Sequence, residues 1–232
     1  MNPAQPSVFF YDPETVRFYI ENYFAPLDLR EIFPLRPGLP LELDLGCGDG
    51  QFLVSMAKLF PERNFIGVER LLGRIRVSSR KAARLGVENL RLLRVESHYL
   101  VQYLLPPASV DVIHVMCPDP WPKRRHQHNR LVQTAFLDVV HTALRPGGEL
   151  RLTTDDAPYF AHMRGVFCGH LGFREEFWEP GPEYPQTDFE QMFRAKGLPM
   201  YRALLRKVER AGMGLVALEG GVALESESRS ES

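Results

Sequence analysis

Short apolar runs alternate with amphipathic stretches from Leu41 onward, and this alternation constrains the fold more than any other feature. The apolar runs predict buried strands at Leu41–Leu45, Phe65–Val68, Leu90–Val95, Val110–Met116 and Glu149–Thr154. The amphipathic stretches predict helices after each strand, namely through Lys58, over Leu72–Leu85, shortly after Val95, through Leu144 and around Tyr159–His170. Strands that alternate with helices are typical of a parallel, doubly wound α/β sheet with right-handed crossovers.

The segments that flank this region differ from it in composition. Residues 1–39 are predicted to form an N-terminal arm with a helix over Glu14–Phe24, packed on the core. Residues 40–212 form the predicted main domain, with an apolar run near Tyr201–Val208. Residues 213–232 form a Ser/Glu-rich tail that we expect to be disordered. The last fourteen residues hold four Glu and one Arg, so they carry −3 and the rest of the chain carries +2.

The whole-chain composition excludes several classes of protein. With 232 residues, 44% hydrophobic and 25% charged, the chain can bury a core without disulfides or a structural metal. A net charge of −1 excludes a uniformly basic nucleic-acid binder, although not a local basic patch. No apolar run approaches the ~20 residues of a membrane span. The three cysteines are scattered, so we expect no metal site and a reduced, cytoplasmic compartment.

A glycine-rich loop follows the first predicted strand. Leu41–Leu45 runs into Gly46-Cys47-Gly48-Asp49-Gly50, after which a helix begins. Glycines permit positive φ and let a ligand approach the backbone, and ligands of doubly wound sheets bind beyond the carboxyl ends of the strands. Dinucleotide sites prefer the spacing G-x-G-x-x-G, whereas this spacing is G-x-G-x-G. The carboxylates Glu42, Asp44 and Asp49 disfavour a pyrophosphate and favour a cationic ligand such as S-adenosylmethionine.

An acidic residue also ends the second predicted strand. Glu69 lies nineteen residues after Gly50, where a carboxylate can bind the two hydroxyls of a ribose. Nicotinamide enzymes carry an acid at the same place, so Glu69 alone does not separate the two cofactors. The alternative structural role is a turn in which Glu69 caps the next helix.

A proline-rich segment follows the fourth predicted strand, at the same edge of the sheet. Pro118-Asp119-Pro120-Trp121-Pro122 excludes a helix and holds Asp119 in a rigid loop. Asp119 is therefore the candidate catalytic residue. Trp121 suits either stacking on a base or anchoring in the core. A metal site made by Asp119, His126 and His128 lacks a recognisable ligand spacing.

Basic residues follow this loop, and two polar segments end the domain. Lys123, Arg124, Arg125 and Arg130 predict a phosphate-binding patch, with a solvated basic face as the alternative. Of Asp155 and Asp156, one is expected to cap a helix and the other to face the substrate. The segment Thr187-Asp188-Phe189-Glu190 matches a capping box, which is its structural interpretation.

Together, these segments resemble the bacterial tRNA (guanine-N7)-methyltransferase family over roughly residues 40–208, most specifically in Pro118-Asp119-Pro120-Trp121-Pro122-Lys123. The resemblance implies a Rossmann-like class I methyltransferase fold, with a mostly parallel seven-stranded sheet and an antiparallel C-terminal strand. It implies S-adenosylmethionine as cofactor and guanine 46 of the tRNA variable loop as target. The implied cofactor contacts are Glu42, Asp44, Gly46, Gly48, Gly50, Glu69, Glu96 and Asp119. The implied substrate contacts are Lys123, Asp155, Thr187, Asp188, Phe189 and Glu190.

The sequence departs from the family pattern at three positions. The family usually has Asp at the position of Glu96, Lys at that of Asp188 and Gly at that of Asp44. Three alternative functions remain: a class I methyltransferase for another RNA or a small molecule, an inactive RNA-binding module and, least favoured by the glycine spacing, a nicotinamide oxidoreductase. The sequence does not separate a monomer from a homodimer.

Overall fold

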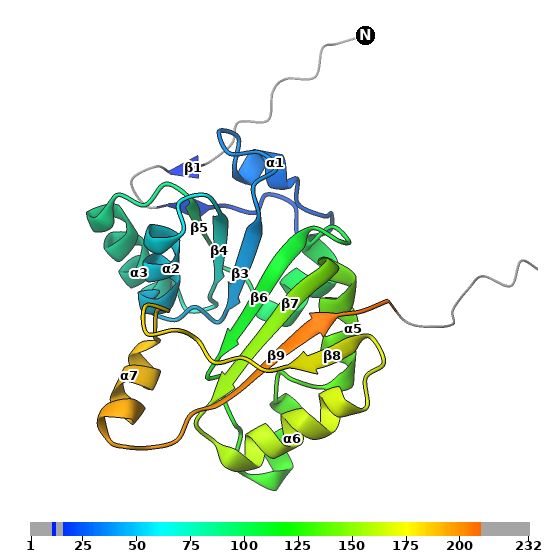
Figure 1. Ribbon diagram of the computed structural model, residues 1–232. Helices are drawn as coiled ribbons and strands as arrows, with labels where there is room; N and C mark the ends of the chain where they lie inside the picture. The colour runs from blue at the N-terminus through cyan, green and yellow to red at the C-terminus, as the bar shows by residue number, and fades with distance from the viewer. Residues whose placement is uncertain (1–10, 13–15, 210–232) are drawn as a thin grey trace, which may run out of the picture.

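The computed structural model describes residues 11–12 and 16–209 (Figure 1). The strands are β1 (Tyr11–Asp12), β2 (Arg17–Phe18), β3 (Leu41–Leu45), β4 (Asn64–Val68), β5 (Leu90–Leu93), β6 (Val110–Met116), β7 (Leu144–Thr154), β8 (Phe173–Glu176) and β9 (Tyr201–Lys207). The α-helices are α1 (Leu29–Ile32), α2 (Gln51–Leu59), α3 (Leu72–Leu85), α4 (Ser97–Tyr99), α5 (Thr134–Ala143), α6 (Ala157–Cys168) and α7 (Asp188–Ala195). A π-helical turn, η1 (Leu100–Leu104), and a 3-10 helix, η2 (Arg124–Asn129), complete the described elements.

One sheet runs through the described part of the chain in the order β1-β2-β5-β4-β3-β6-β7-β9-β8. Strands β3 to β7 pair in parallel, and β9 pairs antiparallel with both β7 and β8. The predicted doubly wound fold, with an antiparallel C-terminal strand, is therefore confirmed. The two short strands β1 and β2 extend the predicted seven strands at the β5 edge.

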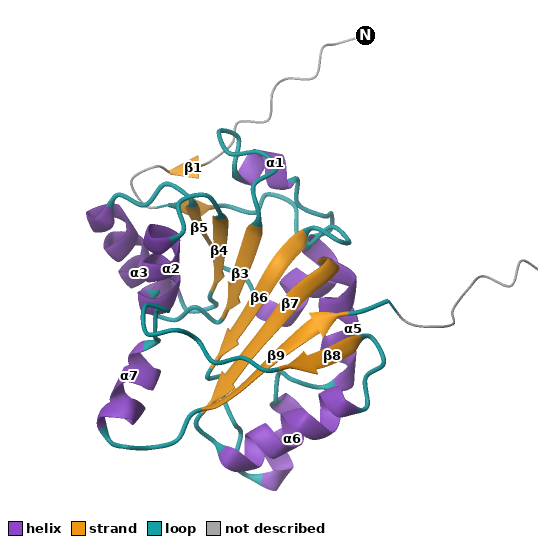
Figure 2. Cartoon of the chain, viewed as in Figure 1, coloured by secondary structure: helices purple, strands orange, loops and turns teal. Residues whose placement is uncertain are grey.

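The two faces of the sheet are covered differently (Figure 2). Side chains alternate along β3, so Leu41, Leu43 and Leu45 enter a core cluster shared with α5 and α6. Glu42 and Asp44 point to the opposite face, the face that α2 and α3 cover with a second apolar cluster. The sequence thus places two carboxylates on one buried face because of the period-two alternation of the strand.

The N-terminal segment differs from its prediction. The helix expected over Glu14–Phe24 is wrong from residue 16 onward, because that stretch contains β2 and turns; the helix of this region is α1. Edge pairing explains the difference: the Leu92 N–H donates to the Val16 carbonyl at 2.9 Å, so the segment satisfies the open edge of β5. The arm before residue 11 and the predicted disordered tail lie outside the described residues.

The C-terminal third also contains elements that the sequence did not predict. Strand β8 forms after α6, and β7 begins at Leu144, five residues before the predicted strand. The loop of residues 177–187 then crosses in front of the sheet from β8 to α7, which lies below α2 (Figure 1). Among the described residues, no helix combines the length and apolar character that crossing a bilayer requires.

Candidate active site

A cavity of about 260 Å³ opens at the carboxyl ends of β3 and β6. The glycine loop forms one wall, the residues that end β6 form a second, and the start of α7 forms the third. The residues that line it include Asp44, Gly46, Cys47, Gly48, Asp49, Gly50, Arg74, Met116, Cys117, Thr187, Asp188 and Phe189. The structure therefore brings the glycine loop together with the Thr187 segment, although well over a hundred residues separate them in the sequence.

The glycines of the loop have two different physical roles. Gly46 has a φ of 86°, and a Cβ added there would meet nothing within 4 Å, so it leaves open space at the cavity. Gly50 has a φ of 74°, and its Cβ would lie 2.7 Å from the Ser78 hydroxyl. That hydroxyl donates to the Gly48 carbonyl at 2.9 Å, which ties the loop to α3. Gly46 thus admits a ligand, whereas Gly50 permits close helix packing.

Asp44 is the buried charge of the cavity. Its side chain is 2% exposed, and its Oδ1 has no hydrogen-bond partner in the described part of the chain. Burial, and to a lesser degree the Glu69 carboxylate, raises the pKa of Asp44 to about 7. An orphaned buried carboxylate oxygen is costly unless a ligand completes it. The site therefore fits a cationic ligand, and the predicted contact of Asp44 with that ligand stays a prediction.

Glu69 and Glu96 follow the neighbouring strands β4 and β5, and both accept hydrogen bonds from backbone N–H groups. Glu69 accepts the Leu71 N–H at 2.8 Å, and its other oxygen lies 3.9 Å from Arg74 Nη1. Glu96 caps α4 by accepting the N–H groups of His98 and Tyr99, the second and third residues after it, at 3.0 and 2.7 Å. The Glu69 hydrogen bond closes a turn before α3, and no side chain caps the N-terminus of that helix. The cofactor contacts of both acids stay predictions.

Glu42 does not line the cavity, so its predicted cofactor contact is not supported by its position. Its carboxylate is fully buried and accepts hydrogen bonds from Arg63 and, at 2.7 Å, from His114 Nε2. Burial alone would raise the pKa of Glu42, but these two donors outweigh it and lower the pKa to about 2. Burial lowers the pKa of His114, so the neutral ring is the donor.

The proline-rich loop presents Asp119 to solvent beside the cavity. Asp119 lies two residues after Cys117, which lines the cavity, and its Oδ1 accepts the Trp121 N–H at 3.0 Å. Cys117 and Trp121 have positive φ values of 52° and 44°, which L-residues rarely adopt. Strained backbone of this kind persists only where the surroundings impose it, and it gathers at functional sites.

Arg130 is one surrounding group that holds this loop, a structural role that the sequence did not predict. It is 6% exposed, its Nε donates to the Pro120 carbonyl at 2.8 Å, and its guanidinium lies 4.9 Å from the centroid of the Tyr159 ring. A buried guanidinium with these partners clamps the loop, and its burial gives no support to the predicted phosphate contact, which stays a prediction.

The other three basic residues match their prediction in position. Lys123, Arg124 and Arg125 are exposed at the start of η2, and none forms an ion pair with a carboxylate of the described residues. They remain candidates for phosphate contacts. No group of three or more His, Cys, Asp or Glu that could hold a metal occurs in the described ranges.

Two predicted helix caps are present, one at the start of α6 and one at the start of α7. Asp156 caps α6 by accepting the Tyr159 N–H at 2.7 Å, which leaves Asp155 near Cys117. Thr187 caps α7 by accepting the Glu190 N–H at 3.0 Å.

Glu190, predicted to bind substrate, is 6% exposed and ion-paired with Arg202. This ion pair gives Glu190 a structural role, and its substrate contact stays a prediction. The preceding residues Asp188 and Phe189 line the cavity, and their substrate contacts stay predictions. Lys123 and Asp155 are not among the residues that line it.

Comparisons with known proteins identify the family. A family described as "Putative methyltransferase" matches residues 39–203. The tRNA (guanine-N(7)-)-methyltransferase of Halorhodospira halophila is 38% identical over 172 residues, which cover 72% of this chain and 74% of that protein. The chain belongs to the tRNA (guanine-N7)-methyltransferase family.

Solved structures of other methyltransferases share the fold of this family member. A mutant of the 16S rRNA (adenine(1408)-N(1))-methyltransferase from Catenulisporales acidiphilia aligns with a TM-score of 0.56 at 17% identity, covering 80% of this chain and 94% of that one. A SAM-dependent O-methyltransferase from Thermotoga maritima aligns with a TM-score of 0.54 at 17% identity, covering 79% and 64%. At such identities the likeness establishes the fold alone.

In this tRNA (guanine-N7)-methyltransferase family member, a network of polar side chains lies beneath the site. It was not predicted from the sequence. Tyr184 packs on Phe52, with ring centroids 5.8 Å apart, and its hydroxyl lies 3.5 Å from His114 Nδ1. Arg151 donates to that hydroxyl at 3.2 Å and to Glu149 at 2.6 Å. The network fixes the loop of residues 177–187, which leads to Thr187. Its members are single polar residues in different strands and in a loop, so no regular spacing in the sequence indicated that they meet.

Proposed function

We propose that this protein transfers a methyl group from S-adenosylmethionine to N7 of a guanosine in tRNA, at guanine 46 of the variable loop. The observation that carries the proposal is the open space at Gly46 next to the Asp44 carboxylate oxygen that lacks a hydrogen-bond partner. Both lie beside the Asp119 loop at one edge of the sheet. Family membership supports both the reaction and the substrate. Because tRNA is the proposed substrate, the proposed compartment is the cytoplasm.

The residues of the site suit a direct methyl displacement that needs no general base to remove a proton. Guanine N7 carries an available lone pair, so the protein has to align the two reactants and stabilise the charge that moves onto the purine. When bound, S-adenosylmethionine supplies an electrophilic methyl group on a sulfonium. Alignment alone can lower the barrier by ~7–11 kcal/mol. Asp44, Gly46 and Gly48 would hold the cofactor, and Asp119 would orient the base and face the developing positive charge.

Incubation with radiolabelled S-adenosylmethionine and an unmodified tRNA transcript tests this proposal. We expect label in 7-methylguanosine, and chain cleavage at the methylated nucleotide should locate it at position 46. A transcript with adenosine at that position is the matched control and should accept no label. Label in another nucleoside, or transfer to ribosomal RNA fragments alone, would instead support a methyltransferase for another RNA. RNA binding without any transfer would support an inactive module.

The Asp44 site makes the proposed cofactor binding dependent on pH. With a pKa of about 7, Asp44 is protonated at low pH and cannot attract a cation. Since only the ionised fraction binds well, the apparent Kd for S-adenosylmethionine should rise about tenfold from pH 8 to pH 6. Asp44→Asn should bind weakly at both pH values, as measured by calorimetry. The matched control is Asp111→Asn at the opposite end of β6, which should keep the pH dependence of the unmodified protein.

The same substitution should stabilise the protein without cofactor. A carboxyl group whose pKa is raised by folding costs stability as the pH rises from its ordinary pKa of 3.8 to about 7. The melting temperature of Asp44→Asn should therefore exceed that of the unmodified protein above pH 7, and the difference should vanish near pH 4. Equal cofactor affinity of the two proteins at pH 8 would remove Asp44 from the binding site.

A further inference from the structure

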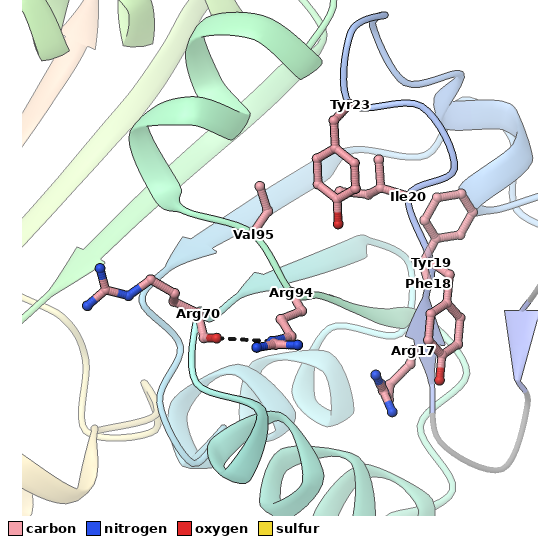
Figure 3. A pocket seen from close by; sticks show the side chains of 8 residues that line it. All are labelled: Arg17, Phe18, Tyr19, Ile20, Tyr23, Arg70, Arg94 and Val95. Atoms are coloured by element: carbon pink, nitrogen blue, oxygen red, sulfur yellow. Dashed lines mark hydrogen bonds between the residues drawn. The ribbon is translucent and has the colours of Figure 1, made fainter.

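A second cavity of about 400 Å³ lies at the β2–β5 edge of the sheet, and the cofactor cavity shares none of its lining residues. Figure 3 shows the side chains that line it. Three are arginines (Arg17, Arg70 and Arg94) and two are tyrosines (Tyr19 and Tyr23). The N-terminal segment supplies one wall, and the residues that follow β4 and β5 supply the other.

Strand pairing holds the two walls in register. β2 pairs in parallel with β5, with Arg17 opposite Leu92, so the residues after β2 lie beside those after β5. The Tyr99 hydroxyl donates to the Tyr23 carbonyl at 2.7 Å and anchors the far end of the segment. The parallel pairing also puts this cavity at the carboxyl edge of the sheet. At ~4.8 Å per strand, β5 lies about 10 Å from β3 and its glycine loop.

The cavity carries positive charge that its own surroundings leave unbalanced. The Arg17 guanidinium lies 4.7 Å from the centroid of the Tyr19 ring, and Arg94 Nε donates to the Arg70 carbonyl at 3.2 Å. Among the side chains of residues 16–209, no carboxylate forms an ion pair with any of the three arginines.

The acids nearest in sequence to Arg70 and Arg94 already accept hydrogen bonds, and Glu21 of the N-terminal segment is exposed and does not line the cavity. Glu69 and Glu96, which flank Arg70 and Arg94, direct their carboxylates to backbone N–H groups. The cavity is therefore suited to an anion.

The aromatic rings add a second kind of contact. Tyr19 and Tyr23 remain 43% and 41% exposed although they border a cavity. In Figure 3, Tyr23 directs its hydroxyl into the space above Arg94, and Tyr19 stands beside Arg17. Exposed aromatic faces next to arginines bind unstacked bases, whose phosphates the guanidinium groups neutralise. A phosphate or a carboxylate alone would use the arginines but not the tyrosines.

We propose that this cavity binds one unstacked nucleotide of the tRNA, distinct from the guanosine that is methylated. Arg17 and Arg94 contact its phosphate, and Tyr23 stacks on its base. This inference rests on the proposed function for the identity of the RNA. The exposed basic residues Lys123 to Arg125 follow β6, on the other side of the glycine loop. The tRNA would thus be held on both sides of the cofactor cavity.

Binding of an unmodified tRNA transcript to the full chain, followed at several salt concentrations, tests the subsite. Arg17→Gln with Arg94→Gln should weaken binding at least tenfold at about 0.1 M salt. The slope of log Kd against log salt should fall by about 0.7–0.9, since the two arginines share one phosphate and each lost phosphate contact contributes ~0.7–0.9. Tyr23→Ala should weaken binding about 5- to 100-fold, whereas Tyr23→Phe keeps the aromatic face and should bind like the unmodified protein.

The matched control removes two arginines at the opposite sheet edge. Arg164 and Arg174 are exposed and pair with Glu175 and Glu176, so Arg164→Gln with Arg174→Gln should leave the salt slope unchanged. Melting temperatures establish that every variant folds. An unaltered tRNA Kd and slope in the cavity variants would overturn the subsite. The subsite would also be overturned if these variants bound tRNA normally but bound S-adenosylmethionine or adenosine monophosphate more weakly.

The design separates this subsite from the proposed function. Binding is measured without turnover, so it tests the cavity even if no methyl group is transferred. If the unmodified protein methylates tRNA and the cavity variants bind tRNA normally, only the subsite is wrong. If the unmodified protein transfers no methyl group to tRNA, the proposed function is wrong.

Discussion

Asp119→Asn is expected to lower kcat for methyl transfer to tRNA about 10²- to 10³-fold, the usual cost of removing one preorganised electrostatic group from a reaction centre. The asparagine side chain can still accept the Trp121 N–H, as Asp119 Oδ1 does at 3.0 Å, so the loop keeps its turn. What is lost is the negative charge that faces the purine as it becomes positive. Single-turnover kinetics with saturating cofactor and tRNA measure this step directly.

Comparing Asp119→Ala with Asp119→Asn separates the effect of the negative charge from the effect of the turn. Asp119→Ala removes both, so it should lower kcat at least as far as Asp119→Asn and also raise KM for tRNA as the loop loosens. S-adenosylmethionine binding, measured by calorimetry, should change by less than about threefold in Asp119→Asn. If Asp119→Asn keeps its kcat while Asp119→Ala loses it, the residue only shapes the loop and the proposed mechanism is wrong.

Apolar periodicity was sufficient to predict the centre of the fold. The bounds of β6 and α3 agree with prediction because each is a long, uniform pattern. The segment after Val16 has an equally helical pattern and yet forms β2. Its conformation is decided by the open edge of β5, a tertiary feature that local spacing does not contain. Strand β8 was missed for a related reason: its four residues form a strand only by pairing with β9.

The location of the site could be predicted, but the direction of each side chain could not. Carboxyl ends of parallel strands meet at one edge, so the glycine loop and the Asp119 loop had to lie together. Glu42 and Asp44 lie two residues apart on the same face, yet only Asp44 lines the cavity. Arg63 and His114 bind Glu42 near the other end of the strand. Arg130 and Glu190 show the same limit, because distant partners bury them.

Glu42→Ala is expected to reduce the free energy of unfolding by about 1–3 kcal/mol, the usual cost of leaving a buried hydrogen-bonding group without its partner. The substitution leaves Arg63 and the fully buried His114 without the carboxylate that binds both. Urea unfolding at pH 7 measures the loss. Glu42→Gln keeps the volume and one acceptor, so it should cost less. If folded Glu42→Gln lost its affinity for S-adenosylmethionine without losing stability, Glu42 would contact the cofactor after all.

Acidification should likewise lower the free energy of unfolding of the unmodified protein, because it neutralises the Glu42 carboxylate. Folding lowers the pKa of Glu42 from 4.5 to about 2, so its contribution is complete above pH 4.5 and declines as the pH falls toward 2. The stability difference between the unmodified protein and Glu42→Gln should therefore narrow over this range, because a protonated Glu42 resembles glutamine. Asp44→Asn should show the opposite sign, with its advantage growing between pH 4 and 7. These opposite slopes would distinguish a carboxylate that stabilises the fold from one that is held for a ligand.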